Sequence, residues 1–186
     1  MAANVAELKQ AQELVKKAMK DAKVRQKACA QAVAKIVDFE KNYQAYVKKL
    51  TSNIDELRSS LSTASGIASR DLKGNPNGDA IDQALTKALA LANANDIKPA
   101  VKLEDLSNAD RFIEAGVKSD NDNILADAIG CLDQASKNYV KQMNDLKQSE
   151  EKVKGLLVQA KEALANQAAR NKVLQLVDQA FKKLMT

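Results

Sequence analysis

Two glutamates are the residues of this sequence whose positions point most directly to chemistry. Glu40 and Glu150 both fall at helix positions where the surrounding pattern places apolar side chains. If the helices that carry them run antiparallel, residues whose numbers sum to roughly 190 lie side by side, and the two carboxylates come close together. When two carboxylates lie close together, the charge of one raises the pKa of the other, and the pair can share a proton or hold a cation. The pair is therefore a candidate pH-sensitive site.

The same two positions also have a purely structural interpretation, which the pattern favours. Each glutamate can extend its carboxylate to solvent past a thin two-helix section, or pair with Lys147 or Lys154. Two more polar residues, Gln12 and Gln26, precede Glu40 at a regular spacing of two heptads. Polar residues at such positions typically fix the register and the oligomeric state of a helical bundle.

Lysines recur along one flank of the first predicted helix and form a basic flank: Lys9, Lys16, Lys20, Lys23 and Lys27. A row of positive charge attracts anionic lipid or nucleic acid. However, Glu13 lies on the same flank, and no aromatic side chain accompanies the lysines. A solvated helix face is favoured, and a nucleic-acid partner is not.

The composition argues against enzymatic chemistry. The chain has no histidine, so a Ser-His-Asp triad and a Glu-x-x-His di-iron site are excluded. Two cysteines cannot supply the four ligands of a zinc site. The segments 75–80 and 119–123 lack the glycine and glutamate spacing of a calcium loop, and there is no glycine-rich phosphate loop. We therefore predict no enzyme, no cofactor and no bound metal.

The elements that carry these residues are helical. Apolar residues alternate at spacings of three and four from Val5 to Ala68, which predicts one coiled-coil-like helix over 3–72. Two short helices are predicted over 79–95 and 105–117, and a second long helix over 122–185. The serine-rich segment 59–69 leaves the continuity of the first helix beyond Ser59 open. The simplest fold is a single all-α domain over 1–186, an elongated antiparallel bundle in which the two long helices form a hairpin.

Length and composition agree with this fold. The chain has 186 residues, 3% aromatic residues, no tryptophan, six glycines and two prolines, as is typical of long helices. No apolar run approaches the roughly 20 residues of a membrane-spanning helix. The first 30 residues also lack a secretory apolar region, because lysines interrupt them. We expect a soluble protein that is either cytoplasmic or exported without a cleaved signal.

The favoured function is that of a non-enzymatic interaction or scaffold protein. A two-helix section with so wide an apolar stripe leaves apolar surface uncovered near the two termini. Self-association or binding of another helical protein is expected there, through Val5, Leu8, Val15, Met19, Val177, Phe181 and Leu184.

Two alternatives remain open at this stage. The predicted architecture resembles that of soluble helical pore-forming toxins and secretion-system translocation proteins, which implies a secreted, membrane-active protein. The apolar segments 85–94 and 123–132 are the candidates for insertion, although core packing explains them equally well. The third possibility is a basic helical nucleic-acid binder that uses the basic flank.

Overall fold

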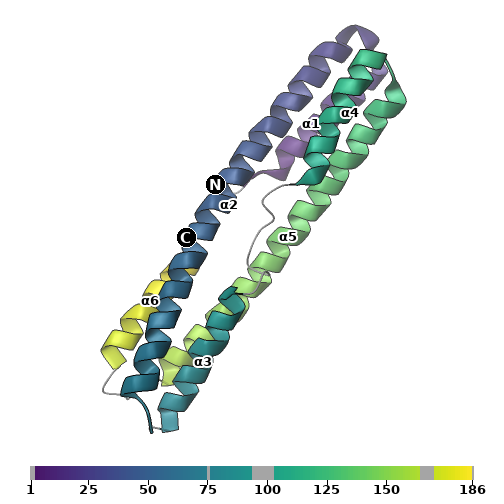
Figure 1. Ribbon diagram of the computed structural model, residues 1–186. Helices are drawn as coiled ribbons and strands as arrows, with labels where there is room; N and C mark the ends of the chain where they lie inside the picture. The colour runs from purple at the N-terminus through teal and green to yellow at the C-terminus, as the bar shows by residue number, and fades with distance from the viewer. Residues whose placement is uncertain (1–2, 75, 94–102, 164–169, 186) are drawn as a thin grey trace. The chain divides into compact units, whose positions relative to one another are not determined.

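The computed structural model describes residues 3–74, 76–93, 103–163 and 170–185 (Figure 1). All the regular elements in these ranges are helical, so the predicted all-α helical bundle is confirmed. In chain order the elements are α1 (Val5–Lys20), the short 3-10 helix η1 (Ala22–Val24), α2 (Arg25–Asp71), α3 (Pro76–Asn93), α4 (Glu104–Ser119), α5 (Asp122–Ala163) and α6 (Arg170–Met185).

The first long helix is divided where the sequence pattern shows no interruption. Helix α1 ends at Lys20, and Asp21 takes an extended conformation with φ −142° and ψ 105°. Arg25 Nε then donates a hydrogen bond of 3.1 Å to the carbonyl of Ala18. These residues would be about 10 Å apart along a straight helix. The prediction of one helix over 3–72 is therefore wrong, whereas α2 itself continues beyond Ser59 to Asp71.

The last long helix is also divided. Lys161 on α5 and Asp178 on α6 form an ion pair of 2.6 Å, although seventeen positions of a straight helix span about 25 Å. Helix α6 therefore folds back on α5 instead of continuing it, and the single helix over 122–185 is wrong. The two short predicted helices correspond to α3 and α4, while residues 94–95 of the first prediction lie outside the described residues.

The chain divides into two compact units. Unit 1 contains Met1–Lys48 and Ala100–Met143, and unit 2 contains Lys49–Pro99 and Asn144–Thr186. Helices α2 and α5 each contribute their first part to unit 1 and their remaining part to unit 2.

Unit 1 is a four-helix bundle of α1, α4 and the first parts of α2 and α5 (Figure 1). In this unit α2 and α5 run parallel, as two contacts between them show: the residue numbers of the contacting pairs differ by nearly the same amount at both places. Arg25 pairs with Asp122 at 2.6 Å at the beginning of both helices, and Tyr43 donates a 2.8 Å hydrogen bond to Gln142 further along. The predicted antiparallel hairpin of the long helices is therefore wrong.

The physical reason is that unit 1 is built from two helical hairpins, α1–α2 and α4–α5, that pack in the same orientation. Asn42 of α2 bonds to Glu7 of α1, and Asn138 of α5 bonds to Asp105 of α4, so the helices of each hairpin are antiparallel while α2 and α5 are parallel. Unit 1 accordingly repeats its buried residues at matching places in the two halves of the chain. On α1 and α4 the matching residues are Leu8 and Leu106, Ala11 and Ala109, Val15 and Ile113, and Ala18 and Gly116; on α2 and α5 they are Cys29 and Leu125, Ala32 and Ala128, Ile36 and Leu132, Phe39 and Ala135, and Tyr43 and Tyr139.

Unit 2 contains α3, α6 and the remaining parts of α2 and α5. Helix α3 runs antiparallel to α2, since Ser65 donates a 2.9 Å hydrogen bond to Asp82 and Arg58 Nε donates one of 2.8 Å to the carbonyl of Ala92. Lys183 of α6 pairs with Glu56 of α2. The core of unit 2 is aliphatic and includes Ile54, Leu57, Leu61, Ile81, Leu85, Val153, Leu157, Val173 and Val177.

Candidate functional site

Helix α4 places one carboxylate at the edge of the core of unit 1. The buried face of α4 consists of Leu106, Ala109, Ile113 and Gly116. Asp110 directly follows Ala109, so its side chain leaves the helix beside this face and is only partly exposed. Its Oδ1 atom is buried and has no hydrogen-bond partner. A polar atom in that state is costly, because the hydrogen bonds to water that it loses on folding are not replaced.

Glu40 of α2 is the carboxylate that acts on Asp110. Burial, and next the charge of Glu40, raise the pKa of Asp110 from its ordinary 3.8 to about 6. Burial also raises the pKa of Glu40. The two half-buried carboxyls, here called the α2–α4 carboxyl pair, bring like charges together where hydration is poor.

The predicted pairing of Glu40 with Glu150 rested on the antiparallel register, which is wrong. Glu40 belongs to unit 1 and Glu150 to unit 2. The pKa of Glu150 is raised by its own burial, with Lys154 lowering it and Glu151 raising it. Glu40 does have a carboxylate neighbour, but that neighbour is Asp110.

The position of Glu40 follows from which residues of the first predicted helix form the centre of unit 1. The centre takes the residue immediately before each predicted polar seam position: Ala11 before Gln12, Arg25 before Gln26, and Phe39 before Glu40. Gln26 is accordingly exposed, and Glu40 is only partly buried. Gln12 is partly buried and donates a 3.4 Å hydrogen bond to the carbonyl of Ile129.

Part of the predicted interaction surface is buried within the structure. Leu8 and Val15 are fully buried in unit 1, and Val177 is fully buried in unit 2. Val5, Met19 and Phe181 are partly buried, and the side chain of Leu184 lies outside the described residues. The expectation that this stripe is open is therefore wrong for Leu8, Val15 and Val177, which α1 and α6 place in the cores of their units.

The basic flank does not form one row. All five lysines are exposed, but Lys9, Lys16 and Lys20 belong to α1, Lys23 to η1 and Lys27 to α2. Because α1 and α2 run in opposite directions, the lysines are divided between two helices and the turn that joins them. Lys16 is also paired with Glu13 at 2.7 Å.

Arg25 is a buried charge that the sequence pattern did not single out. Only 8% of it is exposed, and its guanidinium bonds to the carbonyl of Ala18 and to Asp120 and Asp122. Arg25 thereby ties the turn between α1 and α2 to the turn between α4 and α5. A guanidinium suits this role because its fixed fork of donors satisfies several acceptors at once.

Replacing Arg25 with Gln is expected to lower the free energy of unfolding of unit 1 by about 1.5 kcal/mol, since charge-assisted hydrogen bonds are lost. The measurement is urea unfolding followed by tyrosine fluorescence, because all three tyrosines lie in unit 1 and the chain has no tryptophan. Arg111→Gln, at an exposed position of α4, is the matched control. Equal effects of the two substitutions would contradict the role of Arg25.

Among the described residues, the other chemistry-bearing side chains form no second site. No group of three or more histidine, cysteine, aspartate or glutamate residues within the described ranges is arranged to hold a metal ion. Cys29 and Cys131 are free thiols, and burial raises the pKa of each. What the α2–α4 carboxyl pair can do chemically is to take up a proton near pH 6.

The sequence contained a signal for Asp110. Leu106, Asp110, Ile113 and Val117 are spaced by four, three and four, which places Asp110 on the apolar face of the predicted helix over 105–117.

No protein-family model, curated protein or solved structure matches the chain.

Proposed function

We propose that this protein is a non-enzymatic helical interaction protein, a scaffold that binds a helix of a second copy or of another protein. The observation that carries the proposal is the packing of α1 in unit 1, where it fills a groove formed by α2, α4 and α5. Leu8, Ala11, Val15 and Ala18 of this 16-residue amphipathic helix are fully buried. A groove that accepts an amphipathic helix through residues at spacings of three and four is a common mode of helix recognition.

The α2–α4 carboxyl pair favours this function over an acid-triggered, membrane-active one. Because the pKa of Asp110 is higher in the folded protein than its ordinary value, folding is favoured by protonation. Acid therefore stabilises unit 1 through this pair and does not open it. The nucleic-acid alternative loses its support because the basic flank is divided between two antiparallel helices.

No helix in the described part of the chain combines the length and the apolar content needed to cross a membrane.

The test is sedimentation equilibrium of the full chain at about pH 7.5 and about pH 5, with and without anionic liposomes. We expect reversible self-association at high micromolar concentration at both pH values, without lipid binding. Val37→Asp and Val140→Asp, at valines that are 50% and 46% exposed, should leave the association unchanged, because the groove is not on those faces. A strict monomer would count against the proposal, and liposome binding at pH 5 would favour the membrane-active function.

A further inference from the structure

The buried positions of α1 and α2 keep the same spacing across the turn that joins the two helices. They alternate at spacings of three and four through Leu8, Ala11, Val15 and Ala18 on α1, and through Arg25, Cys29, Ala32, Ile36 and Phe39 on α2. The one place of the series between Ala18 and Arg25 is Ala22, which is exposed in the turn. A straight helix over α1, the turn and α2 would therefore present the same face.

The turn itself contains residues that a helix accepts. Residues 21–24 are Asp, Ala, Lys and Val, without glycine or proline, and none of them has a positive φ. The α4–α5 turn differs, since Asp120 is left-handed at φ 50°, and so does the α2–α3 turn, where Gly74 has φ 81°. The series of buried residues also breaks between Gly116 and Leu125. Of these three turns, only the one between α1 and α2 is compatible with a continuous helix.

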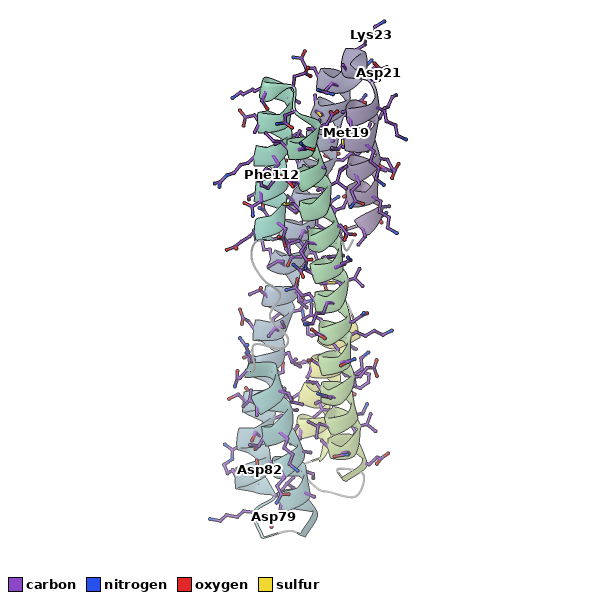
Figure 2. The ribbon with its side chains drawn as sticks, turned by 90° about the vertical axis from the view of Figure 1, so that its right-hand side faces the viewer. Met19, Asp21, Lys23, Asp79, Asp82 and Phe112 are labelled. Atoms are coloured by element: carbon purple, nitrogen blue, oxygen red, sulfur yellow. The ribbon has the colours of Figure 1, made fainter. Side chains whose placement is uncertain are left out.

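Apart from the bonds of Arg25 described above, Asp21 makes the local hydrogen bonds specific to this turn. Asp21 Oδ1 accepts from the backbone N–H of Lys23 at 2.9 Å, and the Asp21 carbonyl accepts from the N–H of Val24 at 3.2 Å. Figure 2 shows Asp21 and Lys23 at this turn, beside Met19 near the end of α1. The carbonyl of Ala18, which accepts from Arg25, would accept from the N–H of Ala22 in a straight helix.

From these observations we infer that α1 is exchanged between two copies of the chain. In the dimer, α1 continues α2 as one helix and packs against α2, α4 and α5 of the second copy, in the place that α1 has in the monomer. The apolar contacts of α1 are then the same as in the monomer, and only the turn changes, which is the condition for low-cost exchange. This inference rests on the proposed function, and it names the second copy as the partner.

Ala22→Pro is the substitution that separates the two states. Ala22 is the first residue of η1 and follows an extended residue, so proline fits the turn. In the interior of a straight helix proline removes a hydrogen bond and clashes with the preceding turn. We expect association about a hundredfold weaker than in the wild type, with the helical circular dichroism and tyrosine fluorescence of the monomer retained. If the wild type dimerises and Ala22→Pro dimerises equally well, exchange is overturned while the proposed function survives.

Asp21→Ala tests the inference in the opposite direction and does not depend on the folding of the proline variant. Each copy loses the side-chain bond that holds the turn, so we expect the dimer to be about tenfold tighter. Asn4→Ala is the matched control, since Asn4 makes a similar bond of 2.9 Å to the N–H of Ala6 at the other end of α1. No tightening relative to this control overturns exchange. A wild type and variants that all stay monomeric overturn both exchange and the proposed self-association.

Discussion

Replacement of Phe39 with Ala is expected to lower the free energy of unfolding of unit 1 by about 3 to 5 kcal/mol. The ring is fully buried. It contacts Tyr139 edge-on at a centroid distance of 5.3 Å and lies nearly parallel to Tyr43 at 6.2 Å, while the two tyrosines are 5.7 Å apart. Removing the ring leaves a cavity among side chains that cannot collapse freely, because both tyrosine hydroxyls are held by hydrogen bonds.

The measurement is urea unfolding followed by tyrosine fluorescence, with Val37→Ala as the control. Val37 lies two positions away on the same helix and is 50% exposed, so its truncation should change the unfolding free energy by no more than about 0.5 kcal/mol. A loss below about 1 kcal/mol for Phe39→Ala would show that the three rings are not the centre of unit 1.

Asp110→Asn is expected to stabilise unit 1 at neutral pH. A pKa raised from 3.8 to about 6 corresponds to about 3 kcal/mol if fully expressed. Asp110 keeps part of its hydration, so we expect about 1 to 2 kcal/mol. The penalty is absent when the carboxyl is protonated in both the folded and the unfolded state. It grows as the pH rises from about 4 to about 6 and is constant above that, so the wild type loses stability over this range.

Unfolding at about pH 4 and about pH 7.5 separates the charge of Asp110 from its shape. The stabilisation by Asp110→Asn should be present at the higher pH and small at the lower one. Asp127→Asn, which removes an exposed carboxylate from the same unit, should have little effect at either pH. An equal gain from Asp110→Asn at both pH values would mean that the pKa of Asp110 is not raised.

The sequence predicted the helical content of the fold, and it failed at the reversals of the chain. Helix composition and spacing are local properties, which is why α3 and α4 lie close to their expected ranges. The turn after Lys20 was not predicted because the apolar spacing continues through Asp21, Ala22 and Lys23, and none of these residues is a glycine or a proline. The two-fold repetition of buried residues was not predicted because it preserves apolar character at matching places more than size or identity, as Phe39 and Ala135 show.

The candidate site was half predicted, for a related reason. A carboxylate at position 40 of an apolar stripe was evident, but its neighbour depends on which helices are parallel. Spacings of three and four fit two adjacent sets of positions equally well, one containing Glu40 and one containing Phe39. Only the packing of α4 and α5 against α2 selects Phe39 for the centre and leaves Glu40 beside Asp110.

The parallel course of α2 and α5 also sets the order in which the protein can be built. Unit 1 joins segments that lie far apart in the sequence, and Tyr139 donates its hydroxyl to the carbonyl of Ala3. During synthesis the α1–α2 hairpin must therefore wait, with its apolar face uncovered, until α5 has left the ribosome. Folding that depends on such distant contacts is slow, and the waiting state is prone to association. No fragment that ends before α5 contains a complete bundle.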